Sequence, residues 1–513
     1  MRARLLAFGA LALSVVAVAG CGSSGGPTFA PGSTVSDQSP GASVARARDV
    51  PEADWLRFDY DAQRTGVGPA ATGITAGNLH TLRLRAVKLP GTVDSSAIEL
   101  TGVKVRGRTG DVIVMTTTYG RTLALDPATG QRLWEFTPRD IGSYQGSAQI
   151  TTATPIADPD RQFVYAASPD GRIHKLALAT GREVHSGGWP VSVTFDATHE
   201  KIAAALNISG NSVVVTTGGY IGDIPPYQGH VVMIDRSSGR ITAVWNALCS
   251  NVHRLIDPPR SCPASDAAIW AREGAVIEPG TGRILVATGN APFNGSTNWG
   301  DSVLELSPDG KQLLHNWTPT DQAQLNSNDL DLGSTAPALL PVFDGRRLAV
   351  QGGKAGVLDL LDLDRLDGTT AGAGPRTGGE VQQLPSPGGD QVFTAPAVWT
   401  HGGRTWIFVG DGSGTWAYTL GGSGAAPRLS VAWKSGSGGT SPVIAGGLLY
   451  VYDPSGSLDV YAPTTGRELL SLPAGSGHWN SPIVVGGRVI LPVGNANDHA
   501  TSGTLEIFHL PGR

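Results

Sequence analysis

The chain has 513 residues with a net charge of −5 at pH 7, and no basic patch stands out, which argues against a partner made of nucleic acid. Gly (70 residues) and Pro (35 residues) are abundant, and they gather in short clusters between apolar runs. No long stretch shows helical periodicity, so this composition predicts many short strands joined by tight turns.

The first residues have the pattern of an export signal. Arg2 and Arg4 give a positive start, and the apolar run that follows at 5–18 is too short to span a membrane comfortably as a helix. Small residues then precede Cys21, which is the arrangement that the bacterial lipoprotein pathway acylates and cuts. We therefore expect residues 1–20 to be a lipoprotein signal peptide, although an ordinary secretory signal with a chance cysteine is the alternative.

Residues 21–52 are rich in Gly, Ser, Pro and Ala and cannot bury enough apolar surface to fold. They are predicted to be a flexible tether that holds a domain at 53–513 off a membrane. The acylated Cys21 is then the expected membrane contact, and the protein is expected on the outer face of the cell membrane or in the periplasm.

Two further cysteines, Cys249 and Cys262, are separated by twelve residues. In an exported chain this even pair predicts a disulfide that closes a surface loop. A metal site is a poor alternative, because the two cysteines and His253 make an incomplete ligand set.

A repeat of four short apolar segments decides the predicted fold. The clearest copy begins at Thr440-Ser441-Pro442 and ends after a turn at Gly466. Eight copies start near residues 95, 150, 199, 267, 333, 392, 438 and 478. Four antiparallel strands repeated eight times can close radially, so the sequence predicts an all-β chain, an eight-bladed β-propeller. An alternating segment at 81–89 precedes the first copy and is predicted to supply a strand to blade eight, closing the ring.

The segment from Ala124 to Trp134, with Asp126 and Gly130 between them, resembles the tryptophan-docking repeat of the pyrroloquinoline quinone (PQQ)-dependent dehydrogenases. Weaker copies end at three other tryptophans: Trp245, Trp317 and Trp433. The resemblance extends over most of 53–513 and implies that these indoles pack between neighbouring blades.

The same resemblance implies a PQQ site at the propeller axis, with a Ca²⁺ or lanthanide ion beside the quinone. The Thr-Gly-Asn segment makes Asn290 a metal ligand, and Trp270 matches the tryptophan that stacks on PQQ. Asp331 matches the catalytic base and is also an expected metal ligand, and Asp329 is the alternative match. Lys354 matches the cation that faces the quinone oxygens.

Two features of the family pattern are missing. The segment at 217–223 contains no Glu where the family has its metal-binding Glu; Tyr220 is the nearest match, and Asp223 could substitute only after a local rearrangement. The segment at 116–120 reads Thr-Thr-Thr-Tyr-Gly, without the family's adjacent cysteine pair.

Three functions remain open from the sequence. The first is a PQQ- and metal-dependent dehydrogenase that oxidises an alcohol, polyol or sugar outside the cell. The second is a non-catalytic propeller that binds an envelope protein or polymer, similar to the lipoprotein of the outer-membrane β-barrel assembly machinery. The third is a propeller that binds another small ligand, such as a sugar, in its axial funnel. The protein is expected to be a monomer.

Overall fold

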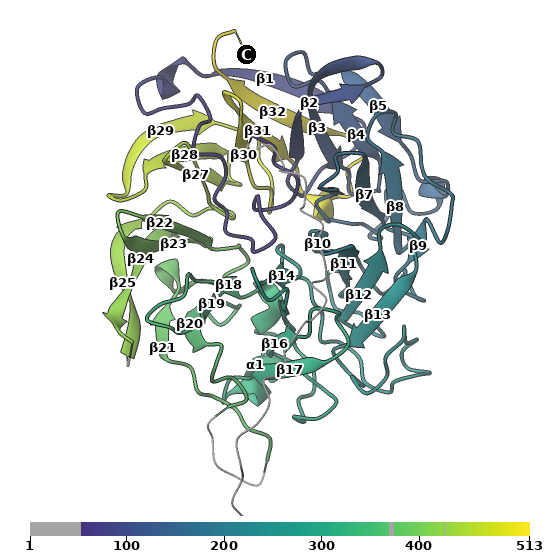
Figure 1. The fold of residues 1–513 in the computed structure, drawn as a ribbon, viewed down its shortest axis with the longest axis vertical. Coiled ribbons are helices and arrows are strands. Elements are labelled where there is room, and N and C mark those ends of the chain that lie inside the picture. The colour runs from purple at the N-terminus through teal and green to yellow at the C-terminus, as the bar shows by residue number, and fades with distance from the viewer. Residues whose placement is uncertain (1–52, 369–373, 425, 513) are drawn as a thin grey trace, which may run out of the picture. The chain divides into compact units, whose positions relative to one another are not determined.

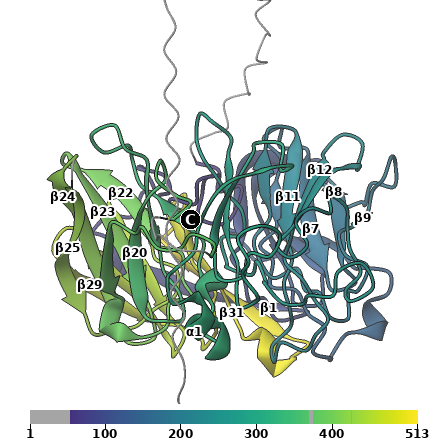
Figure 2. The same ribbon diagram turned by 90° about the horizontal axis from the view of Figure 1, so that it is seen from below.

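The computed structural model describes residues 53–368, 374–424 and 426–512. This part forms eight four-stranded antiparallel sheets arranged in a ring (Figure 1). Figure 2 shows the sheets standing side by side when the ring is turned by 90°. The eight-bladed propeller predicted from the repeats is therefore confirmed.

The first four blades follow one another in sequence, each beginning with its innermost strand. Blades one and two contain β2 (Ile98–Val105), β3 (Arg108–Thr116), β4 (Thr122–Leu125), β5 (Arg132–Phe136), β6 (Ile156–Ala157), β7 (Phe163–Ser168), β8 (Arg172–Ala177) and β9 (Val191–Ser192). Blades three and four contain β10 (Asn207–Ser209), β11 (Ser212–Thr216), β12 (His230–Asp235), β13 (Ile241–Asn246), β14 (Val276–Ile277), β15 (Ile284–Ala287), β16 (Val303–Leu306) and β17 (Leu313–Trp317).

The next three blades repeat this order. Blades five and six contain β18 (Ala338–Leu339), β19 (Leu348–Gln351), β20 (Val357–Asp362), β21 (Gln382–Pro385), β22 (Ala397–His401), β23 (Arg404–Gly410), β24 (Thr415–Ser423) and β25 (Ala426–Ser435). Blade seven contains β26 (Val443–Ala445), β27 (Leu448–Asp453), β28 (Ser457–Ala462) and β29 (Arg467–Pro473).

Blade eight joins the two ends of the ring. Its three C-terminal strands are β30 (Ile483–Val485), β31 (Arg488–Val493) and β32 (Gly503–His509). The fourth strand is β1 (Arg83–Leu89), which pairs antiparallel with β32 from Arg83 opposite His509 to Leu89 opposite Gly503. The prediction that residues 81–89 close the ring is confirmed.

Helical segments are short in the described residues. They are α1 (Gln322–Ser327) and 3-10 turns at Leu79–Thr81, Ile141–Ser143, Leu332–Ser334, Pro387–Gly389 and Ala496–Asp498. Within the described ranges, no helix has both the length and the apolar character that crossing a membrane requires.

The hydrophobic core lies between neighbouring blades, because their strands carry apolar residues on both faces. Trp134 of β5 shows how the docking motif works: its indole N–H donates to a carbonyl of blade two at 2.8 Å, and its ring covers Gly181 in that blade. A Cβ at Gly181 would lie 2.6 Å from the indole, so the Trp134 ring can pack here only because this turn residue has no side chain. Trp433 donates in the same way to blade seven at 2.7 Å, and Trp245 and Trp317 are buried, as predicted.

An N-terminal segment crosses the middle of the ring (purple in Figure 1) and touches every blade. The contacts, in blade order, are Trp55–Glu99, Leu56–Ala157, Arg57–Asn207, Ala62–Ile277, Gln63–Leu339, Thr65–Val398, Gly68–Ile444 and Thr72–Gly487. We call residues 55–72 the axial plug. Its many partners explain why a segment without strand or helix periodicity is buried and ordered.

Arg64 anchors the axial plug. Its guanidinium donates to the carbonyl oxygens of Phe58 (2.7 Å), Glu273 (3.0 Å), Leu206 (3.0 Å) and Ala205 (3.4 Å), and the side chain is buried. The bonds to Glu273, Leu206 and Ala205 tie the plug to the loops of blades three and four that lead to the axial cavity described below, and the bond to Phe58 lies within the plug.

Candidate functional site

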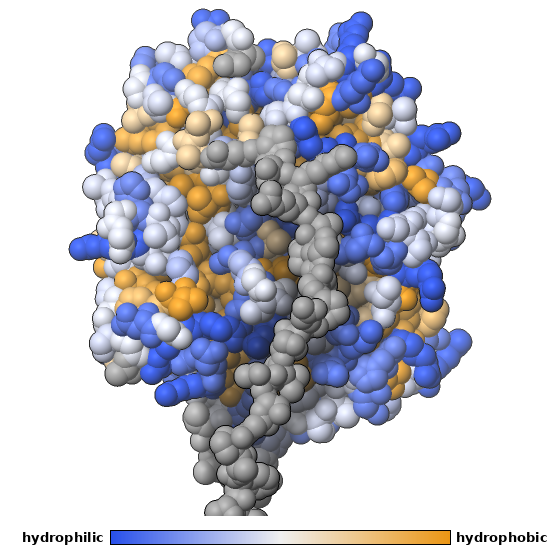
Figure 3. Space-filling model, viewed as in Figure 1, coloured by the Kyte–Doolittle hydropathy of each residue, from blue (hydrophilic) through white to orange (hydrophobic). Residues whose placement is uncertain are grey.

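A cavity of about 670 Å³ lies where loops from seven of the eight blades converge. Its wall includes residues that come from distant parts of the sequence: Asp94, Lys201, Trp270, Asn290, Asp331, Lys354, Phe393 and Trp479. Six of them lie in loops that lead into the innermost strands, and Asn290 and Lys354 follow the second strands of their blades, which is why they meet near the axis. Figure 3 shows hydrophilic residues along much of the rim of the face that Figure 1 presents, with hydrophobic patches among them and further in.

The four residues singled out from the sequence all line this cavity. The Asp331 carboxylate accepts the backbone N–H of Asn290 at 2.8 Å through Oδ1, and its Oδ2 lies 2.5 Å from Lys354 Nζ. The same ammonium lies 3.1 Å from Asp329 Oδ1 and 5.6 Å from the centre of the Trp270 ring. The side-chain amide of Asn290 donates to Asp329 at 3.0 Å, so both alternative aspartates belong to the cluster. Asp331 is buried in the wall, whereas the Asp329 side chain is exposed.

Two glycines allow this close approach. A Cβ at Gly289 would lie 2.1 Å from Asp331 Oδ1, and one at Gly333 would lie 2.5 Å from the backbone nitrogen of Gly289. Both positions must stay without a side chain for the loop of Asp331 to pack against the loop of Asn290.

On the acidic side of the cavity, charged neighbours shift the pKa values of Lys354 and Asp301. Burial alone would lower the pKa of Lys354, but the carboxylates of Asp331 and Asp329 outweigh burial and raise it. Burial raises the pKa of the neighbouring Asp301 carboxyl to about 8. The backbone N–H of Leu332, which donates to Asp301 at 3.2 Å, lowers this pKa, and the negative charge of Asp331 raises it further. Lys354 is therefore charged at neutral pH, while Asp301 holds a proton there.

Three aromatic rings line the cavity together. The ring centroids of Trp270 and Trp479 are 5.7 Å apart, those of Phe393 and Trp479 are 5.4 Å apart, and those of Trp270 and Phe393 are 6.0 Å apart. Of these three aromatic residues, only Trp270 was predicted from the sequence. A usable signal was present, because Phe393 and Trp479 each come directly before the small-residue–Pro motif that opens a repeat.

A basic cluster in the cavity wall was not predicted from the sequence. Asp94 Oδ1 accepts from Arg272 at 2.8 Å, and Asp94 Oδ2 lies 2.8 Å from His478 Nδ1. Although burial alone would raise the pKa of Asp94, Arg272 and His478 hold it well below its usual range. The Arg272 guanidinium also lies 4.7 Å from the centre of the Trp479 ring, and Lys201 lines the same wall.

The missing metal ligand is not replaced. Tyr220 donates its hydroxyl to the carbonyl of Ala197 at 2.9 Å, and Asp223 accepts the hydroxyl of Tyr227 at 3.0 Å. Within residues 53–512, gaps aside, no group of three His, Cys, Asp or Glu side chains is placed to hold a metal ion. The substitution by Asp223 that was considered from the sequence would thus have to break its bond to Tyr227.

The predicted disulfide is present: the Sγ atoms of Cys249 and Cys262 are 2.06 Å apart. Cys21, the signal peptide at 1–20 and the tether at 21–52 lie outside the described residues.

Comparisons with known proteins agree with this architecture. A family model described as outer membrane protein assembly factor BamB matches residues 87–259. The dehydrogenase subunit of the alcohol dehydrogenase (quinone) of Acetobacter aceti is 25% identical over 321 residues, which is 55% of this chain and 40% of that protein. The aligned region therefore spans less than half of the relative's length.

Solved structures share the fold at low identity. Quinohemoprotein alcohol dehydrogenase from Comamonas testosteroni has a TM-score of 0.63 and 16% identity, with coverage of 90% of this chain and 81% of that one. A europium-containing methanol dehydrogenase has a TM-score of 0.63 and 15% identity, covering 90% of this chain and 98% of that one. Together these matches confirm the resemblance to the PQQ-dependent dehydrogenase-like eight-bladed propellers.

Proposed function

We propose that the axial cavity binds a planar quinone of the PQQ class and that the protein oxidises an alcohol, polyol or sugar outside the cell. The observation that carries this proposal is the convergence of Trp270, Asn290, Asp331 and Lys354 on one cavity from four separate loops. The match to a quinone-dependent alcohol dehydrogenase supports it.

The residues present fit PQQ. The cavity of about 670 Å³ has the size of a small-molecule site, and the aromatic ring of Trp270 can stack on a flat heterocycle. Lys354 can contact quinone oxygens, and Asn290 Oδ1 is buried without a hydrogen-bond partner in the described part of the chain, so it can accept from a ligand. PQQ would supply an acceptor for the two electrons removed from the substrate.

The chain's own residues supply the polar chemistry. Asp331 lines the cavity, where its carboxylate can take the proton of a substrate hydroxyl as a general base, and its Oδ2 is held 2.5 Å from Lys354 Nζ. Lys354 can then stabilise negative charge that develops on the bound ligand. The Trp270, Phe393 and Trp479 rings give this part of the wall an apolar surface.

The residues present do not fit the divalent or lanthanide ion of the family. Calcium takes six to eight oxygen ligands in typical sites, whereas the oxygens of Asp329 and Asp331 here contact the ammonium of Lys354. Tyr220 stands where the Glu is expected and turns its hydroxyl to Ala197. We therefore propose that Lys354, rather than a metal ion, provides the positive charge of this site.

One observation favours a second candidate function. The loss of the metal-binding Glu and of the cysteine pair, with Thr116–Thr118 at its place, is what a non-catalytic propeller would show. Such a protein would bind an envelope protein or polymer rather than turn over a substrate. In both cases we propose a monomer that is exported and anchored to the membrane by lipid on Cys21.

The test is a titration of the full-length chain in detergent with PQQ, followed by tryptophan fluorescence, with and without Ca²⁺ or La³⁺. The proposal expects saturable quenching without added metal that is lost in Trp270→Ala. Trp416→Phe is the matched control, because Trp416 lies in β24 under Lys434 and away from the cavity wall. A chain that shows no saturable quenching under any of these conditions is not a quinoprotein.

A further inference from the structure

Lys201 stands on the wall of the axial cavity with its backbone held firmly. Its N–H donates to the carbonyl of Gly218 at 2.7 Å, and its own carbonyl accepts from the N–H of Gly218 at 2.9 Å. The side chain shares the wall with Thr152, Ala203 and Arg272. These two bonds hold the backbone of Lys201 against Gly218, which follows β11 of blade three.

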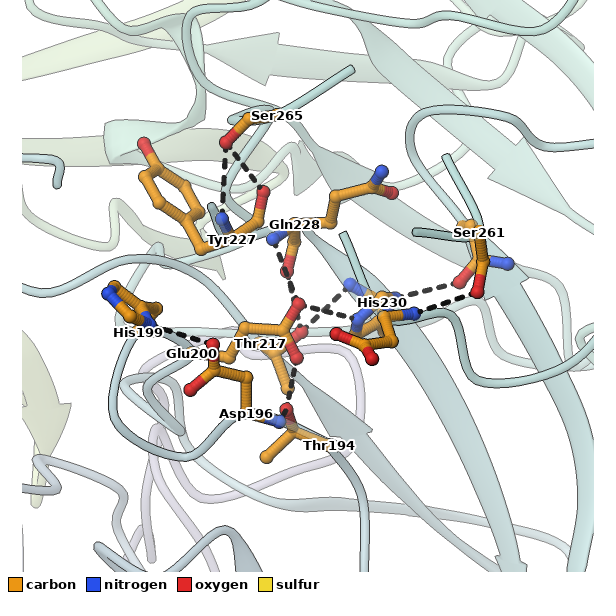
Figure 4. Close-up of polar contacts among 12 residues, drawn as sticks. Thr194, Asp196, His199, Glu200, Thr217, Tyr227, Gln228, His230, Ser261 and Ser265 are labelled. Atoms are coloured by element: carbon orange, nitrogen blue, oxygen red, sulfur yellow. Dashed lines mark hydrogen bonds and ion pairs between the residues drawn. The ribbon is translucent and has the colours of Figure 1, made fainter. Parts of the chain in front are cut away.

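The neighbouring carboxylate is not available to Lys201. Figure 4 shows Glu200 within a buried network, where its Oε1 lies 3.0 Å from His230 Nε2 and accepts the N–H of Gln228 at 3.1 Å. Burial alone would lower the pKa of His230, but Glu200 and Asn246 outweigh burial and raise it. The side chains of Glu200 and His230 are both fully buried and hydrogen-bonded to each other. The Glu200 carboxylate is therefore engaged and does not pair with the ammonium of Lys201, the next residue.

No hydrogen bond or ion pair joins Lys201 Nζ to any other residue in the described part of the chain. Burial, helped by repulsion from Arg272 and opposed by Asp94, lowers the pKa of this amine to about 8. It is still largely protonated at neutral pH. Lys201 is half-buried, and a cation that is partly withdrawn from water and has no partner interacts more strongly with an anion than a fully solvated one does.

Arg272 adds a second cation with unused donor capacity. Its Nη2 and Nη1 donate to Asp94 (2.8 Å) and to the carbonyl of Thr152 (3.2 Å), but its buried Nε has no hydrogen-bond partner. Asp94 also accepts from His478 and from the backbone N–H of Ala496, so its single charge is already shared. The two cations Lys201 and Arg272 therefore face one carboxylate, Asp94, which is also shared with His478.

We infer that Lys201, next to Arg272, forms an anion subsite that receives a carboxylate or phosphate group of the axial ligand. A ligand anion would give Lys201 a partner, and its hydrogen bonds to the two cationic side chains would be charge-assisted. The subsite lies in the cavity of the proposed function but does not require a quinone, since a sugar acid or a sugar phosphate offers the same chemistry.

Isothermal titration calorimetry of the full-length chain in detergent tests the subsite, with tricarballylate as the carboxylate probe and inorganic phosphate as the phosphate probe. We expect saturable binding of at least one probe, and the tighter one identifies the head group. Lys201→Met should weaken that binding by about tenfold or more, whereas Lys201→Arg should keep it within about threefold. Binding of neither probe, or equal binding to wild type and Lys201→Met, would overturn the inference.

A second measurement needs no variant. Acetylation of individual lysines in the wild-type chain is followed by mass spectrometry, with the exposed Lys434 as the internal control. The tighter probe should slow acetylation of Lys201 and leave Lys434 unchanged; equal rates with and without the probe would refute the subsite. A chain that binds either probe through Lys201 but does not bind PQQ would refute the quinone proposal and leave this subsite standing.

Discussion

Replacing Arg64 by Met tests whether the axial plug is held by one buried cation. The substitution keeps an apolar stem of similar length and removes the guanidinium that donates to four backbone carbonyls at 2.7–3.4 Å. Truncating a buried charged partner typically lowers the free energy of unfolding by about 3–5 kcal/mol, because the groups left behind are desolvated and unpaired. Some of the four carbonyls can rehydrate, so we expect a loss at the lower end, about 3 kcal/mol.

The assay is urea unfolding of the variant and the wild type, combined with limited trypsin digestion. A loosened plug should lower the urea midpoint and expose the bond after Arg57 to cleavage under native conditions. Arg404→Met is the matched control, since Arg404 is an exposed arginine at the start of β23. If Arg64→Met and Arg404→Met have the same midpoint and the same digestion pattern, the plug is not anchored by Arg64 and this reasoning is wrong.

Three further outcomes follow from the structure. Gly181→Ala should lower the urea midpoint more than Gly107→Ala, because both glycines have positive φ (+73° and +81°) but only the former would place a Cβ against Trp134; equal effects would contradict the docking account. Asp301, with a pKa raised to about 8, stabilises the fold in its neutral form below about pH 4 and loses this contribution as the pH rises to 8. The stability of Asp301→Asn relative to wild type should therefore grow by up to about 1.4 kcal/mol per pH unit between pH 4 and 8 and then level off, and a pH-independent difference in melting temperature would refute this. Ca²⁺ or La³⁺ should leave the melting temperature unchanged, and a saturable increase would contradict the loss of the metal site.

The ring could be predicted because each blade repeats a local pattern. Short apolar strands, turn glycines such as Gly466 and the alternating segment at 81–89 are local signals, and each was found in the predicted place. The disulfide was predictable for a different reason: with Cys21 assigned to lipidation, Cys249 and Cys262 were the only cysteines left to pair. The axial plug carries no period, and its structure comes from contacts with all eight blades, so propensity alone could not reveal it.

The acidic half of the site could be predicted and the basic half could not. Asn290, Asp331 and Lys354 stand in segments that resemble a known family, so each could be picked out from its neighbours in sequence. Asp94 and Arg272 are 178 residues apart, and neither lies in a distinctive motif. Their pairing arises only when the ring closes and brings blade one beside the loop of blade four at the axis.

The most direct test of the central claim is a crystal structure of the chain soaked with PQQ. The account predicts a flat molecule stacked on Trp270, with its quinone oxygens beside Lys354 and no metal ion between Asp329 and Asp331. A quinone bound elsewhere on the propeller, a metal ion held by these aspartates, or an axial cavity that stays without quinone at saturating PQQ would contradict it.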